Sequence, residues 1–341
     1  MAKLDLLNLV EDDIVGEIKG LKGIWYGKNN LGKSFQATKL PKSLIIMTES
    51  GVSNYKCKKV PVTTWSKFKE VVDSLTKEST LDEMLSAYNW IVIDTAENLA
   101  DLSERAVCNQ FGVRDLSEIQ GRQNGYKIAR SDFNMQIQKL TSVGFNVLFI
   151  MHEETIERED ELTGDTYTYV QPKGTSNEKS SLRMLRDLSD ICIYLKSNGV
   201  DKETYDVIPS TAICRETRNV FARARMDIDM FIEPFSSTNF LESVQKAIEK
   251  SAENEGVALA EYTRKVDTYT KEDYFGIIEP YVKKLWGICQ KDVVDILEMY
   301  LGTTKDGKSR KITDATDDEL IPLDNIYNDL VTKATLLGVE V

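Results

Sequence analysis

The sequence is poor in histidine and in paired cysteine. It contains one histidine, His152, and five cysteines that lie far apart, none of them in a Cys-x-x-Cys pair. A structural zinc site takes closely spaced cysteine and histidine ligands, and a Ser-His-Asp triad needs a histidine beside its nucleophile. The sequence therefore argues against both kinds of site elsewhere in the chain, and it favours reduced, mostly buried thiols.

Long apolar runs are also missing. No run approaches the roughly twenty apolar residues that a membrane-spanning helix requires. Residues 1–17 have neither the basic start nor the apolar centre of a secretory signal peptide. We therefore expect no membrane association and a cytoplasmic location.

Basic residues are outnumbered by acidic ones. The chain has 43 lysines and arginines against 55 aspartates and glutamates, a net charge of −12. Such a chain does not suit a protein that coats DNA in bulk, although a local basic stripe can still serve a nucleic-acid partner. With 41% hydrophobic residues among 341, the chain is long enough for one large domain and a smaller one.

Short apolar runs alternate with segments of helical spacing through the first 240 residues. Such runs are typical of parallel strands buried on both faces, so residues 1–240 are predicted to form an α/β domain with a parallel, doubly wound sheet. Residues 241–341 are predicted to be a helical C-terminal region with a break near 302–307. We expect strands at 23–27, 43–48, 90–94, 146–151 and 190–195 and near Val220, and helices at 33–40, 65–85 and 133–143.

Residues 27–34 match the phosphate-loop pattern Gly-x-x-x-x-Gly-Lys-Ser/Thr in full, between an expected strand and an expected helix. Glycines let the backbone N–H groups turn towards a phosphate, and the helix N-terminus adds partial positive charge there. Lys33 is expected to reach the β- and γ-phosphates of ATP, and Ser34 to ligate Mg²⁺. The residues expected to bind ATP are Gly27, Lys28, Asn29, Asn30, Leu31, Gly32, Lys33, Ser34 and Phe35.

Asp94 ends an apolar strand, and ligands in such sheets bind outside the carboxyl ends of the strands. We expect Asp94 to hold Mg²⁺ through water, together with Ser34. Thr95 follows where many AAA+ ATPases have a glutamate, so the base that activates water must come from elsewhere. Glu49, just past the strand 43–48, is the first candidate, and Glu97 is its rival.

The signatures of other classes of P-loop protein are absent from this sequence. The chain has no Asn-Lys-x-Asp motif for guanine and no Leu-Ser-Gly-Gly signature of ABC ATPases. A small-molecule kinase would need an arginine-bearing lid over a substrate pocket, which the helical C-terminal region does not obviously supply. ATP is therefore the expected nucleotide.

The chain resembles the phage-encoded RecA-like P-loop ATPases of the AAA_24 type, a group that includes single-strand-annealing recombination ATPases. Asn29-Asn30-Leu31 departs from the Pro/Gly/Ser-rich loop common in that family, and the last hundred residues match only loosely. The resemblance spans about residues 15–240. The matching pieces are Tyr26-Gly27, Thr48-Glu49-Ser50-Gly51, Val92-Ile93-Asp94-Thr95, Gly144–Val147, Met151-His152-Glu153, Asp190–Leu195 and Phe221-Ala222-Arg223-Ala224-Arg225.

The resemblance implies a RecA-like core that assembles side by side, with ATP at the interfaces of a homo-oligomer in the cytoplasm of a phage host. It places the catalytic carboxylate at Glu49 and a γ-phosphate contact at His152, although a plain strand-end histidine remains the alternative. It also implies that Arg223 and Arg225 reach the γ-phosphate of a neighbouring subunit. Arg215 and Arg218 are the other candidates for that role.

Single-stranded DNA is the expected partner, in phage recombination or replication. In the RecA arrangement, the loops after the strands of Asp94 and His152 line the central path, and here these are 112–130 and 153–181, the second with a hairpin at 162–166. Basic side chains interleaved with aromatic ones suit single strands. The second stretch also carries acidic residues, so a loader or sensor that acts on a protein partner, without direct DNA binding, remains the alternative. The basic and aromatic residues are Arg114, Arg122, Tyr126, Lys127, Arg130, Tyr167, Tyr169, Lys173 and Lys179.

Overall fold

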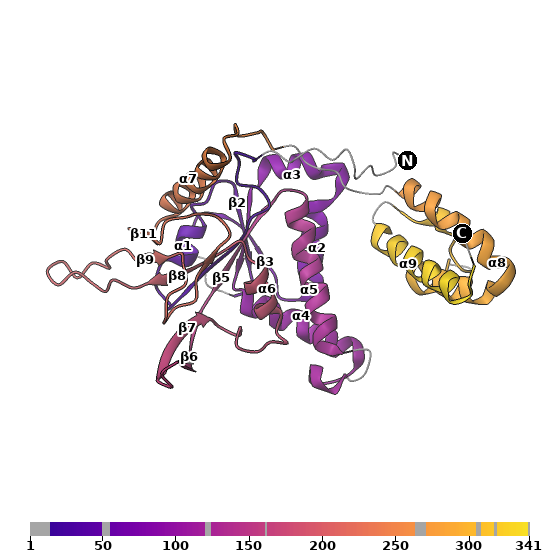
Figure 1. Cartoon of the computed structure of the whole chain (residues 1–341), viewed down its shortest axis with the longest axis horizontal. Coiled ribbons are helices and arrows are strands. Elements are labelled where there is room, and N and C mark those ends of the chain that lie inside the picture. Colours follow the sequence, from indigo (N-terminus) through magenta and orange to yellow (C-terminus); the bar gives the residue numbers. More distant parts are fainter. Residues whose placement is uncertain are drawn as a thin grey trace. The chain divides into compact units, whose positions relative to one another are not determined.

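The computed structural model describes residues 14–49, 55–119, 124–160, 162–262, 271–304, 308–316 and 319–339. The described chain forms two compact units, one within residues 11–264 and one within residues 265–341. The first contains the sheet, and the second is helical (Figure 1). Among the described residues, no helix combines the length and the apolar character that crossing a membrane would require.

The first unit is built on a nine-stranded sheet in the order β11-β9-β8-β1-β5-β4-β2-β3, with β10 also paired to β8. The six strands from β8 to β3 in this order run parallel, and β9, β10 and β11 are antiparallel additions at one edge. The predicted α/β fold with a mostly parallel sheet is therefore confirmed. The strands are β1 (Lys22–Gly27), β2 (Ser43–Met47), β3 (Lys58–Pro61), β4 (Trp90–Asp94), β5 (Asn146–Met151), β8 (Ile191–Lys196), β9 (Thr211–Ile213), β10 (Arg223–Ala224) and β11 (Phe231–Ile232).

Helices cover both faces of this sheet (Figure 1). Alternate residues of each strand face opposite sides, so Ile24 and Tyr26 pack in one core and Trp25 packs in the other. One core lies against α2, α4 and α5, and the other lies against α1 and α7. The helices are α1 (Lys33–Ala37), α2 (Trp65–Thr76), α3 (Leu81–Ala87), α4 (Ala96–Phe111), α5 (Gly125–Ser142), α6 (Ser181–Leu188) and α7 (Ser237–Glu255), with short 3-10 turns at Glu78–Thr80 and Leu116–Glu118.

The helix α7 belongs to the sheet unit, although the sequence placed the boundary between the two regions at residue 240. Ser236 caps its first turn by accepting a hydrogen bond from the N–H of Asn239. Phe240 is fully buried, with its ring centroid 5.0 Å from that of Trp25. The compact unit accordingly continues to residue 264.

Two stretches expected to be irregular are more regular than predicted. The helix α5 begins at Gly125 rather than near Phe133, because Asn124 accepts a hydrogen bond from the N–H of Lys127 and caps the first turn. Residues 153–172 form the hairpin of β6 (Glu153–Glu159) and β7 (Thr166–Pro172), and the predicted turn near 162–166 is confirmed. The strand expected near Val220 is shorter and lies three residues later, as β10 (Arg223–Ala224). Val220 itself forms only isolated bridges, with Val170 and Thr217.

The helical unit consists mainly of α8 (Lys271–Leu301) and α9 (Leu320–Leu336), with a 3-10 turn at Ile312–Asp314. The helix α8 is kinked at Cys289, whose backbone is not helical. It ends before Gly302, whose φ of 73° is the left-handed conformation typical of a residue just past a helix. The core of the helical unit includes Ile278, Leu285 and Val293 from α8 and Leu323 and Ile326 from α9. The predicted helical C-terminal region is therefore confirmed.

Candidate nucleotide-binding site

The phosphate loop lies between β1 and α1, at the carboxyl edge of the sheet. Gly27 has a φ of 149°, and a Cβ atom there would lie 2.7 Å from the carbonyl oxygen of Leu195, so the position requires glycine. Gly32 has a φ of 78° and precedes the first turn of α1. The loop lines a pocket of about 340 Å³. The lining residues are 29–35, Glu49, Tyr55, Asp94, Thr95, Ile150 and His152.

Lys33 is buried in this loop, with only 7% of its surface exposed. Its ammonium group donates hydrogen bonds to the carbonyl oxygens of Gly27, at 2.8 Å, and Lys28, at 2.6 Å. Burial lowers the pKa of Lys33 from 10.5 to about 8, although the carboxylates of Glu97, Asp94 and Glu153 oppose the shift. The loop thus holds a cation whose proton is unusually easy to lose while no phosphate is bound.

This lowered pKa predicts that nucleotide affinity falls as the pH rises above about 8. A triphosphate favours the charged form of the Lys33 ammonium, so nucleotide binding raises the pKa of Lys33. Where Lys33 is deprotonated in the free protein, binding therefore takes up a proton. Above pH 8 the affinity should fall by up to about tenfold per pH unit, until the pH reaches the pKa of the bound state. Titration calorimetry between pH 7 and pH 10 in buffers of different ionisation enthalpy measures both quantities.

Lys33→Arg is the control for this pH dependence, because an arginine stays charged throughout the range. The variant should bind without proton uptake at residue 33. Equal pH dependence in the two proteins would contradict the assignment.

Ser34 and Asp94 meet in the same pocket. Asp94 is 7% exposed at the end of β4, and burial raises its pKa, whereas a hydrogen bond from the Ser34 side chain acts in the opposite direction. A hydroxyl and a carboxylate are hard oxygen ligands, as Mg²⁺ prefers. No cluster of three or more His, Cys, Asp or Glu side chains that fits a metal occurs within the described residues. The pair therefore suits an ion that takes its remaining ligands from phosphate and water.

Glu49 follows β2 and reaches the pocket beside Asp94. Its Oε1 atom accepts hydrogen bonds from the Thr95 hydroxyl and from the Asn98 side-chain amide, both at 2.9 Å. Thr95 is in turn fixed by its backbone, which exchanges hydrogen bonds with the Thr48 hydroxyl at 2.7 and 2.9 Å. The carboxylate is therefore oriented by the first turn of α4 and the end of β2.

Glu97 has a different environment. Its Oε1 atom accepts a hydrogen bond of 2.6 Å from the backbone N–H of His152 and lies 3.3 Å from Nδ1 of the same residue. The hydrogen bond between the His152 imidazole and the Glu97 carboxylate is the main reason that the pKa of His152 is raised. His152 lines the pocket, whereas Glu97 is absent from its lining. Of the two candidate bases, the geometry favours Glu49, and Glu97 instead orients His152.

Comparison with known proteins places this site in a family. A family model described as an AAA domain, AAA_24, matches residues 19–226. The chain belongs to the AAA_24 family. The AAA_24 match extends from the strand β1 past β10, so it includes the whole pocket.

The AAA_24 chain is also similar to the SPbeta prophage-derived uncharacterized protein YorG of Bacillus subtilis (strain 168). The two are 30% identical over 323 residues, which cover 92% of this chain and 94% of the relative. The similarity therefore extends through the helical unit. Together with the family match, it supports a phage-associated P-loop protein.

Arg223 and Arg225 do not line the pocket of their own AAA_24 domain. Arg223 pairs with Cys192 near the start of β8, level with Ile24 in the middle of β1, whereas the phosphate loop follows Gly27 at the end of β1. The Arg223 guanidinium donates to the carbonyl oxygen of Asp187, and Arg225 bonds the Asp190 carboxylate at 3.2 Å.

The sequence patterns missed several residues that line the AAA_24 pocket or hold its side chains. Thr95 and Asn98 hold Glu49, and Tyr55 lines the pocket with its ring centroid 5.5 Å from that of Phe35. Thr95 and Asn98 follow the strand that ends at Asp94, which is the signal that could have indicated them. Tyr55 carries no such signal, since it stands in the connection between β2 and β3.

Proposed function

We propose that the chain binds ATP with Mg²⁺ and hydrolyses it to ADP and phosphate. The observation that carries this proposal is the single pocket that brings together Lys33, Ser34, Asp94, Glu49 and His152. A cation, an Mg²⁺-binding pair and a base are groups that phosphoryl transfer to water uses, and the imidazole can donate a further hydrogen bond. The order β1-β5-β4 also places His152 between the phosphate loop and Asp94, which supports a RecA-like arrangement.

Each of these residues has a separate task in the proposed reaction. Lys33 leaves the carbonyl oxygens of Gly27 and Lys28 for the β- and γ-phosphates, and Ser34 and Asp94 hold Mg²⁺, which neutralises phosphate charge when bound. Glu49 accepts a proton from the attacking water, and His152 donates a hydrogen bond to the γ-phosphate. Steady-state phosphate release with and without EDTA tests the proposal. A protein that hydrolyses no ATP in the presence of Mg²⁺ would contradict the proposal.

We propose that single-stranded DNA stimulates this hydrolysis. The two stretches after β4 and β5 meet on the surface: the Arg130 guanidinium donates to the carbonyl oxygen of Glu178 at 3.3 Å, and the Lys179 ammonium lies 5.9 Å from the ring centroid of Tyr126. Lys127 and Lys179 are exposed there. A surface that combines lysines with a tyrosine ring suits phosphates and bases together.

Replacing Lys127 and Lys179 with alanine is therefore expected to weaken the stimulation by DNA while basal hydrolysis is retained. Each lost phosphate contact should reduce the slope of log affinity against log salt by about 0.7. Hydrolysis assays over a series of oligonucleotide and salt concentrations measure both effects. Lys77→Ala with Lys202→Ala is the matched control, because these exposed lysines lie on other parts of the unit. Equal losses in the two double variants would overturn the surface assignment.

The hairpin β6–β7 favours the second candidate function, action on a protein partner. Tyr169, expected to stack on a base, is buried: its hydroxyl bonds the Glu216 carboxylate and the Arg158 guanidinium lies 3.4 Å from its ring centroid. The Arg218 guanidinium similarly lies 5.1 Å from the ring centroid of Tyr167. Both tyrosine rings therefore contact side chains of the protein itself. ATP hydrolysis that is indifferent to DNA would therefore favour a protein partner.

We also propose that the protein forms a homo-oligomer in which Arg223 or Arg225 reaches the nucleotide of a neighbour. The support is their surface position together with their absence from the lining of the pocket of their own chain. Sedimentation of the wild-type protein with and without ATP tests the assembly. A monomer under both conditions would contradict it.

A further inference from the structure

An open hollow of about 530 Å³ lies between α2, α4 and α5 of the sheet unit. These three helices pack side by side (Figure 1). The residues that α5 contributes stand three and four positions apart, so they form one face of that helix. The lining residues are Lys69 from α2, Val107 and Gln110 from α4, Asn124 at the N-cap of α5, and Lys127, Ile128, Ser131, Asp132 and Met135 from α5.

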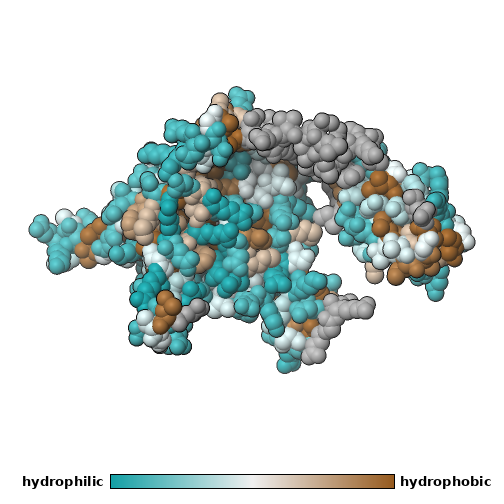
Figure 2. Space-filling view, in the orientation of Figure 1, coloured by the Kyte–Doolittle hydropathy of each residue, from teal (hydrophilic) through white to brown (hydrophobic). Residues whose placement is uncertain are grey.

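The walls of the hollow combine apolar surface with amide groups. Val107, Ile128 and Met135 supply the apolar side chains. Hydrophilic residues form much of the described surface that Figure 2 shows, so apolar walls are not a general feature of this surface. Gln110 is exposed, and its amide makes no hydrogen bond to any described residue. Asn124 caps α5 with its side-chain oxygen, which leaves its amide nitrogen as a donor. A nucleobase has apolar faces and an edge of donors and acceptors that amides can pair with.

The charges at the hollow suit a ligand that carries a phosphate. The Asp132 carboxylate is already satisfied, because it accepts a hydrogen bond of 2.7 Å from the Trp65 indole and lies 3.7 Å from the Lys69 ammonium. Lys127 is exposed, and in the part of the chain that the structure describes its ammonium forms no ion pair. The hollow thus offers a lysine whose charge is available to a phosphate.

Lys127 belongs both to this hollow and to the surface proposed above for single-stranded DNA. On that surface, Tyr126 and Arg130 of the same helix lie against Lys179 and Glu178. A strand whose phosphates meet Lys127 therefore has the hollow beside its backbone. Bases of a single strand are unpaired and can turn out of their stack into such a site.

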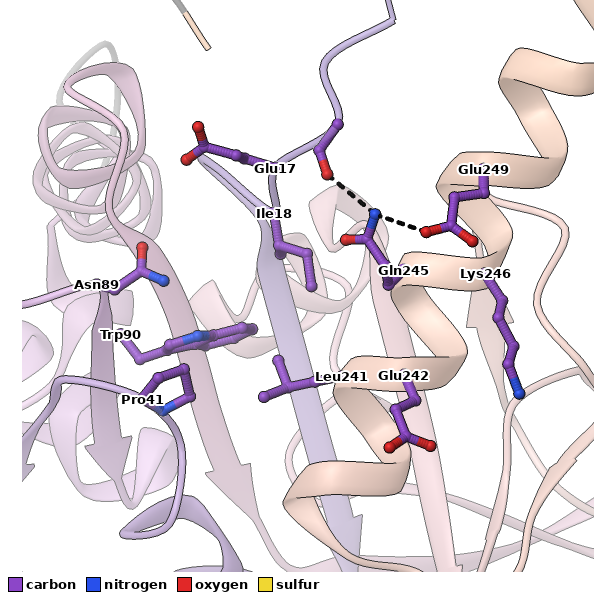
Figure 3. A pocket seen from close by; sticks show the side chains of 11 residues that line it. Glu17, Ile18, Pro41, Asn89, Trp90, Leu241, Glu242, Gln245, Lys246 and Glu249 are labelled. Atoms are coloured by element: carbon purple, nitrogen blue, oxygen red, sulfur yellow. Dashed lines mark hydrogen bonds between the residues drawn. The ribbon is translucent and has the colours of Figure 1, made fainter. Parts of the chain in front are cut away.

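A second hollow of the same unit does not suit DNA. It lies beside α7, and Trp90 stands in its wall (Figure 3). The carboxylates of Glu17, Glu242 and Glu249 surround it, together with Lys246. An excess of carboxylates repels phosphates, so we expect no nucleotide there.

We propose that the hollow between α2, α4 and α5 receives one base of a single DNA strand, with a neighbouring phosphate at Lys127. The base lies against Ile128 and Met135, and the amides of Gln110 and Asn124 hydrogen-bond to its edge. This inference rests on the proposed binding of single-stranded DNA. It adds a contact with a base to the contacts that the lysines make with the backbone, and it is separate from the nucleotide-binding pocket.

Fluorescence anisotropy with two labelled oligonucleotides of equal length tests the proposal. One is an ordinary single strand, and the other has abasic sites throughout, so the two carry the same number of phosphates. The full-length protein should bind the ordinary strand more tightly. The effect of a variant on the two strands can then be compared as a double-mutant cycle, which isolates the contribution of the bases.

Gln110→Ala should weaken binding of the ordinary strand by up to about tenfold, the usual effect of losing one hydrogen bond, and should leave binding of the abasic strand unchanged. Asn109→Ala is the matched control, because it removes an exposed amide from the same turn of α4 outside the hollow. Since Gln110 is exposed, its replacement leaves the core intact.

Ser131→Leu fills the hollow and should have the same selective effect, whereas Ser142→Leu at the exposed end of α5 should have none. If the wild type binds the ordinary strand and the two hollow variants weaken it no more than their controls, the base site alone is overturned. Equal losses with the abasic strand would overturn it as well. A wild-type protein that binds neither strand would contradict the proposed DNA role and the base site together.

Discussion

Lys33→Ala is expected to lower the rate of ATP hydrolysis by at least about a hundredfold, the usual effect of removing one positioned donor from a developing charge. The Lys33 ammonium is buried and held within the phosphate loop, so its loss removes the charge that the β- and γ-phosphates would meet. Nucleotide binding should weaken as well. Phosphate release at saturating ATP and titration calorimetry measure the two effects.

Lys28→Ala is the matched control, because it removes the same charge from the same loop. The Lys28 side chain is exposed, and its contact with Lys33 is made through its backbone carbonyl oxygen. We expect activity within a few-fold of the wild type. Full activity in Lys33→Ala would mean that the pocket is not where ATP reacts.

Glu49→Gln is expected to reduce turnover by about 10² to 10⁴ while ATP binding is retained, as expected for the loss of a general base. The glutamine oxygen can still accept the hydrogen bonds from Thr95 and Asn98, so the side chain keeps its place but cannot take a proton. Single-turnover hydrolysis and nucleotide-binding assays separate the chemical step from binding.

Glu97→Gln distinguishes the two candidate bases. The hydrogen bond that the Glu97 carboxylate accepts from the His152 imidazole raises the pKa of His152, so removing the charge of Glu97 should lower that pKa. If turnover needs the protonated imidazole, the alkaline limb of the pH–rate profile should then move to lower pH, while the maximal rate changes little. A loss of turnover in Glu97→Gln as large as that expected for Glu49→Gln would instead make Glu97 the base.

The parts of the fold and of the site that the sequence predicted are the local ones. The phosphate loop is eight contiguous residues, and the strand before Asp94 is one apolar run, so both can be recognised without knowing what lies beside them. The order of the strands brings Ser34, Glu49, Asp94 and His152 to one edge, as expected for parallel strands. Their catalytic roles stay predictions.

The sequence could not predict contacts between distant segments. Glu97 and His152 are brought together only because β4 and β5 are neighbours, and Glu97 therefore remained a rival to Glu49 as the base. Arg223 was assigned from a motif, but its place outside the pocket lining depends on the antiparallel pairing of β10 with β8. Tyr169 was expected on a surface, but it packs under Arg158. Periodicity alone does not reveal which face of a hairpin is covered.

The position of α7 also decides where the protein can be divided for crystallisation or for assays on the isolated ATPase part. The family match ends at residue 226, but Phe240 and Val244 of α7 are fully buried against the face of the sheet that holds Trp25 and Trp90. A protein shortened to the matched residues would leave both indoles facing water, which favours aggregation over a soluble domain. A fragment that retains residues 14–262 keeps that face covered, and it separates the two units within the connection between them.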